Sequence, residues 1–262
     1  AIGGDRVVTT RAIAADQDPH QVQARPSLIS AVRRADLVIC TGAGLEEGWL
    51  PVLLSRAANP RVQQAPGRLY AADHVSLMEI PRRLDRSDGH LHAAGNPHLH
   101  LDPRRLLQVA AIVQQQLSAL DPDHAGHYQQ RHQQFQHDWQ HAMTRWHELA
   151  APLRGQRVVV HHRSFSYLLD WLGMETLAEM EPRPGLPPTP RHLQRILEQL
   201  QQQPASLILY APFNGDQGAR WLASRSNACA LMLPFSHDVS LFALFDELVS
   251  RMTTTLEQCR ER

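Results

Sequence analysis

Histidines are the residues of this chain whose number and spacing point most directly to chemistry. The sequence has 16 of them among 262 residues. Imidazole is the commonest metal-binding side chain in proteins and the usual proton shuttle. Four groups lie where predicted elements end: His20; His90, His92, His98 and His100; His161 and His162; and His237 with Asp238. Such groups, far apart in the sequence, favour a metal site that folding assembles.

The densest group lies in the segment 88–103, which Gly and Pro turns bound on both sides. Four imidazoles in so short a stretch are poorly explained by packing, so we expect at least one of them to bind metal. His98 and His100 are two residues apart, and in extended backbone they share a face while Leu99 and Leu101 point the other way.

The other groups have two interpretations each. His20 follows the first predicted strand and is either a ligand or a solvated loop residue. His161 and His162 end a buried strand, where α/β proteins place ligands; neighbouring side chains point to opposite faces, so only one should enter a site. His237 and Asp238 are either ligands or part of a turn that caps a helix at 239–250.

Composition excludes several classes of function. Basic and acidic residues balance at 26 each, so a nucleic-acid partner is not expected. The chain has no lysine, which excludes Schiff-base chemistry, and it has no P-loop, H-E-x-x-H or G-x-S-x-G pattern. The loop 42–48 misses the spacing of a dinucleotide-binding loop by one residue. The three widely spaced cysteines argue against a thiolate site and a disulfide framework, although their state stays open.

Short apolar runs alternate with helical patterns, which predicts an α/β fold with parallel sheets. The expected strands are Arg6–Thr10, Asp36–Thr41, Gly67–Ala71, Arg157–His161, Ser206–Tyr210 and Ala228–Pro234. Expected helices include Pro26–Ala35 and Pro190–Gln202, which begin near Pro as helices often do. The segment 182–188 is expected to be a rigid, proline-rich connector.

A long helix is predicted from Asp121 to about Ala151, with an apolar stripe along one face. It is too long for a crossover within one small sheet, so we interpret it as a link between two lobes. The predicted organisation is an N-terminal α/β lobe at 1–118, a linking helix at 119–152 and a C-terminal α/β lobe at 153–262. No apolar run approaches the about 20 residues that span a bilayer. Because the chain begins with Ala, we interpret it as a mature form without its targeting segment.

Five segments, in order, resemble the solute-binding proteins of zinc and manganese ABC importers over nearly the whole chain. They are Gln17–His20, Ala35–Glu46, Asp85–Pro103, Val159–Tyr167 and Glu181–Pro188. The resemblance implies two α/β lobes joined by one long linking helix, with metal in the cleft between the lobes. Its metal ligands fall on His20, His98 and His162, with Asp238 as the nearest match to a fourth, acidic ligand. His90 stands where the family has an acidic residue.

The function that the resemblance implies is capture of Zn²⁺ in the periplasm and its delivery to the permease of an ABC importer, without catalysis. Three neutral imidazoles and one carboxylate suit zinc better than manganese. A monomer is expected, and a periplasmic metallochaperone is a further candidate partner. The alternative is a zinc hydrolase with an open three-histidine site. His237 or water competes with Asp238 for the fourth position, and His90, His92 and His100 are weaker ligand candidates. We expect His90 and His92 to form a loop that collects metal for the main site.

Overall fold

The computed structural model describes residues 1–81, 92–183 and 185–261. The chain divides into two compact units. The N-terminal unit comprises Ala1–Ile80 and His92–His141, and Ala142–Arg262 forms most of the C-terminal unit. His90 lies outside the described residues. None of the helices in the described part of the chain combines the length and apolar character that a membrane crossing needs.

The N-terminal unit is built around a small parallel sheet of two strands, β1 (Val38–Cys40) and β2 (Arg68–Tyr70). Its helices are α1 (Pro26–Arg34), α2 (Leu50–Ala57) and α3 (Pro103–Leu120). Pro26 and Pro103 stand in the first turns of α1 and α3, where the missing N–H costs nothing. The core of this unit is formed by apolar residues of α1, β1 and α2: Leu28, Val32, Cys40, Leu50, Leu53 and Leu54.

The predicted first strand, Arg6–Thr10, is wrong. The residues after the short 3-10 helix Gly4–Arg6 form no strand, and the Val8 side chain is 97% exposed. A short apolar run makes a strand only where a partner strand accepts its hydrogen bonds. In the described N-terminal unit, β1 pairs only with β2.

The long helix α4 (Ala125–Leu149) contributes residues to both units. With 25 residues it is about 37 Å long. The predicted stripe is buried at Tyr128, Phe135, Trp139, Ala142 and Trp146, whereas Leu149 is 58% exposed. The ends predicted as helix are separate 3-10 helices, Pro122–His124 and Ala151–Leu153.

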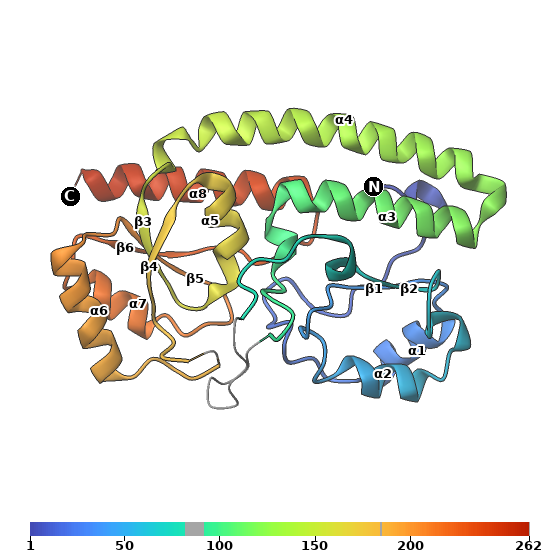
Figure 1. The fold of residues 1–262 in the computed structure, drawn as a ribbon, viewed down its shortest axis with the longest axis horizontal. Helices are drawn as coiled ribbons and strands as arrows, with labels where there is room; N and C mark the ends of the chain where they lie inside the picture. The colour runs from blue at the N-terminus through green and yellow to red at the C-terminus, as the bar shows by residue number, and fades with distance from the viewer. Residues whose placement is uncertain (82–91, 184, 262) are drawn as a thin grey trace. The chain divides into compact units, whose positions relative to one another are not determined.

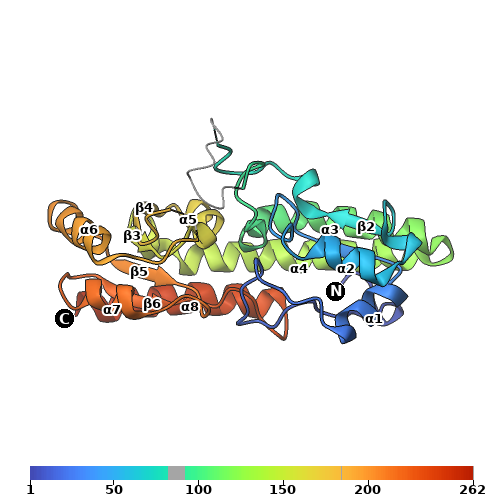
Figure 2. The ribbon, with the colours of Figure 1, turned by 90° about the horizontal axis from the view of Figure 1, so that it is seen from below.

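The C-terminal unit contains a four-stranded parallel sheet in the order β4-β3-β5-β6. The strands are β3 (Arg157–Val160), β4 (Glu175–Glu179), β5 (Leu207–Tyr210) and β6 (Cys229–Met232). Its helices are α5 (Ser166–Leu172), α6 (Pro190–Gln202), α7 (Gln217–Ala223) and α8 (Leu241–Arg260). Figure 1 and Figure 2 show α6 and α7 on one face of the sheet, with α5 and α8 on the other.

The order of the strands fixes where this sheet can carry a ligand. From β3 the chain moves to β4 on one side, and then returns to β5 and β6 on the other side of β3. The direction therefore reverses between β3 and β5, and ligands of open α/β sheets bind at such a switch point, beyond the carboxyl ends of the strands. His161 and His162 directly follow β3 at this end.

Strand β4 was not predicted. Its residues Glu175 and Thr176 are exposed, and it pairs only with β3 at the edge of the sheet. An edge strand does not need the continuous apolar run that marks a buried parallel strand.

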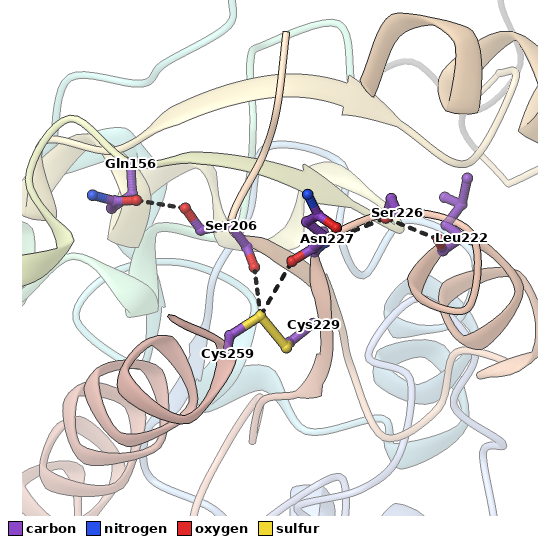
Figure 3. The surroundings of a disulfide bond; sticks show 8 residues. Gln156, Ser206, Leu222, Ser226, Asn227, Cys229 and Cys259 are labelled. Atoms are coloured by element: carbon purple, nitrogen blue, oxygen red, sulfur yellow. Dashed lines mark hydrogen bonds between the residues drawn. A yellow bond between two sulfur atoms is a disulfide. The ribbon is translucent and has the colours of Figure 1, made fainter. Parts of the chain in front are cut away.

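The cysteine spacing argues against a disulfide framework and leaves the state of the cysteines open; in the structure one disulfide joins Cys229 of β6 and Cys259 of α8. Their Cα atoms lie 6.0 Å apart although 30 positions separate them in the sequence. Figure 3 shows the bridge between the end of α8 and the strand, with Sγ of Cys259 3.4 Å from the carbonyl oxygen of Asn227. The pairing depends on the packing of α8 beside β6, which cysteine spacing does not reveal. Cys40 is a buried free thiol.

Candidate metal centre

His20 lies in a loop of the N-terminal unit, and Asp18 fixes the orientation of its ring. Oδ1 of Asp18 accepts hydrogen bonds from the backbone N–H of His20 at 3.0 Å and from its Nδ1 at 2.7 Å. The turn is tied to the rest of the unit by Trp49, whose indole N–H donates to the carbonyl oxygen of Pro19. An ionised carboxylate only accepts, so Nδ1 carries the proton and Nε2 carries the lone pair.

His98 has the same arrangement with an amide in place of the carboxylate. Oδ1 of Asn96 accepts from the backbone N–H of His98 at 2.9 Å and from its Nδ1 at 2.8 Å. Nδ2 of Asn96 donates to the carboxylate of Glu79 at 2.9 Å, which fixes which end of the amide faces His98. His98 is 1% exposed, and Nε2 again carries the lone pair.

The two arrangements share a three-residue pattern that sequence reasoning missed. Asp18-Pro19-His20 and Asn96-Pro97-His98 both place an Asx side chain two residues before the histidine, with proline between them. Asx side chains readily accept from the backbone two residues on, and proline restricts the residue before it to extended backbone. A repeated Asx-Pro-His sequence was the signal that could have predicted the orientation of both rings.

Gly95 allows the chain to approach closely next to Asn96. Its φ is +119°, and a Cβ at this position would lie 2.9 Å from the carbonyl oxygen of Met78. The same carbonyl accepts the backbone N–H of Asn96. A larger residue at position 95 would therefore displace the amide that orients His98.

Three imidazoles of the N-terminal unit form a cluster: those of His20, His92 and His98. The ring centroids of His20 lie 5.3 Å from those of both His92 and His98, and the centroids of His92 and His98 are 6.0 Å apart. Nε2 of His20 and Nε2 of His92 are 3.2 Å apart. Two nitrogens about 2.0–2.1 Å from one zinc ion in tetrahedral geometry have a similar separation.

His162 of the C-terminal unit is oriented by a carboxylate that is distant in sequence. Its Nδ1 lies 2.8 Å from Oε2 of Glu181, which also accepts the backbone N–H of Gly185. Burial would raise the pKa of Glu181, but the hydrogen bond and charge of His162 and the Gly185 N–H hold that pKa below its ordinary value. The carboxylate therefore stays ionised and accepts the Nδ1–H of His162, so Nε2 carries the lone pair whenever this ring is neutral.

His161 differs from its neighbour. It is 7% exposed, and its burial lowers the pKa of the imidazole even though Glu181 lies 3.9 Å from its Nε2. The expectation that only one of the pair enters a site stays a prediction. His162 is the less buried of the two.

The remaining predicted residues stand in different surroundings. The prediction that His98 and His100 share a face is wrong, because Leu99–Leu101 forms a 3-10 helix. At three residues per turn, positions two apart point in different directions. The carboxylate of Asp238 is exposed in the loop between β6 and α8. His237 accepts the backbone N–H of Val239 at Nδ1, so the proton of the neutral ring is on Nε2, which lies 3.7 Å from Glu247.

Comparisons with known proteins identify the family and the fold of the chain. A family described as "ZnuA: Zinc-uptake complex component A periplasmic" matches residues 1–259. The manganese-binding lipoprotein MntA of Halalkalibacterium halodurans is 25% identical over 199 residues, which cover 75% of this chain and 61% of that protein. The match to this chain thus spans less than two thirds of the length of MntA. The high-affinity zinc uptake system protein ZnuA of Yersinia pestis is 23% identical over 222 residues, 79% of this chain and 70% of that one.

Among solved structures, a crystal structure of ZnuA superposes with a TM-score of 0.82 at 19% identity, covering 97% of this chain and 92% of the other. The similarity confirms the predicted α/β fold of the two-lobed ZnuA type. The relatives are solute-binding proteins of metal importers and not enzymes.

Proposed function

Because this chain belongs to the family of periplasmic zinc-uptake components, we propose that it captures Zn²⁺ outside the cytoplasm and delivers the ion to the permease of an ABC importer. The proposed ligands are Nε2 of His20 and His98 from the N-terminal unit and Nε2 of His162 from the C-terminal unit. Zinc is the cargo in this proposal and is released unchanged.

The observation that supports the proposal most is that all three imidazole rings are hydrogen-bonded in the same way. Each donates its Nδ1–H to a side-chain oxygen, of Asp18, Asn96 and Glu181 respectively. Metal-binding histidines commonly have such a partner, which fixes the tautomer and ring direction and makes the other nitrogen more basic. Three rings prepared in this way are suited to a borderline-soft divalent ion.

Zinc is proposed over manganese on the chemistry of the donors. Imidazole nitrogen suits zinc, whereas manganese favours carboxylate, carbonyl and water oxygen. One relative binds manganese, so the titration described below compares both ions.

Asp238 is proposed as the fourth ligand. A carboxylate would partly neutralise the charge that three neutral imidazoles leave on the ion. His237 is a weaker candidate, because its Nδ1 lone pair accepts the Val239 N–H and its Nε2 is on the side of Glu247. His92, whose Nε2 is 3.2 Å from that of His20, is the alternative from the N-terminal unit. In a crystal structure with zinc, a carboxylate oxygen of Asp238 about 2.0–2.2 Å from the ion supports the assignment, and His92, His237 or water there rejects it.

The disulfide supports a location outside the cytoplasm. Structural disulfides persist in the periplasm and outside cells, whereas reducing systems keep cytosolic thiols reduced. The Cys229–Cys259 bridge joins a strand to the C-terminal helix of the chain and thus belongs to the folded structure of its unit.

Calorimetric titration of the metal-free protein tests the proposal. We expect one tight zinc site per chain, much weaker binding of manganese, and loss of the tight site in the variant His20→Ala/His98→Ala/His162→Ala. Replacement of the exposed His147 on α4 by Ala is the matched control and should leave the affinity unchanged.

Two results would overturn the proposal. The ligand assignment fails if the triple variant retains the wild-type zinc affinity. The transport function fails if the zinc-loaded protein hydrolyses ester, amide or phosphate substrates and His98→Ala abolishes that activity, as a zinc hydrolase would require.

A further inference from the structure

A second pair of histidines lies on helix α4, outside the proposed capture site. His137 and His141 are four residues apart, and both side chains are exposed. Their ring centroids are 4.4 Å apart with an angle of 63° between the ring planes. Residues four apart lie on one face of an α-helix, one above the other.

The packing of α4 fixes the direction in which this pair points. Phe135 and Trp139 are buried on the opposite side of the helix, and the indole N–H of Trp139 donates to the carbonyl oxygen of Pro103. The helix cannot turn the histidines inward without exposing these aromatic rings. The pair is therefore held toward solvent on a rigid backbone.

From this geometry we infer that His137 and His141 bind a second divalent metal ion, one per chain, with water in the remaining coordination positions. Two imidazoles that share a tetrahedral ion through one nitrogen each have centroids about 5 Å apart, close to the separation present. The helix supplies both ligands without a change of fold.

The chemistry of the pair selects the ion. Imidazole suits zinc, copper and nickel, whereas magnesium, calcium and manganese favour oxygen ligands. Two protein ligands and an exposed position make the site weaker and faster to exchange than a buried site with three or four ligands. The inference is independent of the proposed function, because neither histidine belongs to the capture site.

Calorimetry with Zn²⁺ on the full chain tests the inference. We expect tight binding of one zinc ion per chain, followed by weaker binding of about one more zinc ion per chain. The variant His137→Asn/His141→Asn should abolish only the weaker binding event. His132→Asn is the matched control: this histidine lies on the same helix but has no histidine three or four residues away, so both events should remain. The variant His20→Ala/His98→Ala/His162→Ala should retain the weaker event.

The result that overturns the inference is a weaker event that persists in His137→Asn/His141→Asn, or a wild-type chain that binds no second zinc. Light scattering during the titration adds another criterion. A stoichiometry of half an ion per chain together with a doubled mass would mean that two copies share the ion, which contradicts a site within one chain.

Discussion

In the N-terminal unit His20 and His98 stand in loops, whereas in the C-terminal unit His162 directly follows a strand of a four-stranded sheet. The two loop histidines are oriented by side chains only two residues away, Asp18 and Asn96. His162 is oriented by Glu181, 19 residues further along the chain and just beyond β4. Local turns thus orient the two histidines of the N-terminal unit, whereas tertiary pairing of strands orients His162 of the C-terminal unit.

This difference predicts where each unit is vulnerable. Local turns can orient a ring even where the sheet has only two strands. A ring oriented through strand pairing depends on the stability of the whole sheet. The C-terminal unit carries the disulfide, which connects β6 of this sheet to α8.

The largest expected effect comes from removing that disulfide. The variant Cys229→Ser/Cys259→Ser should lower the free energy of unfolding of the C-terminal unit by about 3–4 kcal/mol, because the bridge closes a loop of 30 residues. Hydrogen exchange followed by mass spectrometry measures the loss of protection in each unit separately. Wild-type protein with reductant should behave like the variant, and reductant should not change the variant further. Equal loss of protection in both units would contradict the assignment of the bridge to one unit.

The next effect concerns the residues that orient the rings. Asp18→Ala and Glu181→Ala should each weaken zinc binding by about 10–100-fold, because the imidazole loses its fixed tautomer and direction. Asp18→Asn and Glu181→Gln keep an acceptor oxygen and should retain most of the affinity.

Calorimetric titration distinguishes these outcomes, with Asp16→Ala as the control, since Asp16 is an exposed residue of the same loop as Asp18. Because Glu181 joins the end of β4 to His162, Glu181→Ala should also reduce protection from hydrogen exchange around β4. Asp18 acts within a local turn, so Asp18→Ala should change zinc binding alone. Wild-type affinity in both alanine variants would show that the rings need no such partner.

A smaller effect is expected from the loop that contains His90 and His92. We predict that replacing both residues by Ala slows zinc uptake at low zinc concentration and changes the equilibrium affinity little. Of these two histidines the structure describes His92, which lies beside His20, as the predicted transfer of an ion to His20 requires. Stopped-flow competition with a fluorescent chelator measures the rate, and His100→Ala is the control. An unchanged rate, or a large loss of affinity instead, would reject the role of a collector.

The effect that is smallest at neutral pH concerns Cys40 in the N-terminal core. Burial, followed by the nearby charge of Glu46, raises the pKa of this thiol to about 12. Above its ordinary pKa of about 8.5 an unfolded chain releases the thiol proton, while the folded chain keeps it until about pH 12. The folded state then binds more protons, so the free energy of unfolding should fall as the pH rises through this interval.

The Cys229→Ser/Cys259→Ser variant, in which Cys40 is the single cysteine, allows a direct measurement. Iodoacetamide at pH 8.5 should modify Cys40 readily in denaturant and very slowly in the folded protein, because the thiolate is the reactive form. Equal rates in the two states would contradict the raised pKa.

Sequence patterns predicted much of this molecule where the signal is local. Helix α6 spans Pro190–Gln202 as predicted, because Thr189 caps its N-terminus and an apolar face repeats along it. Strands β3, β5 and β6 lie within their predicted ranges. For the buried inner strands β3 and β5 the reason is that continuous apolar runs are typical of parallel strands covered on both faces. The Asx-Pro-His sequences also determine locally how His20 and His98 are held.

Tertiary structure alone decided the features that join distant segments. Strand β4 exists because the edge of β3 supplies its hydrogen bonds, and the Cys229–Cys259 bridge exists because α8 packs beside β6. The pairing of Glu181 with His162 and of Glu79 with Asn96 also depends on where the chain returns. Propensity and periodicity describe each residue with its near neighbours, whereas a hydrogen bond or a disulfide between distant segments forms only after packing has brought its two partners together.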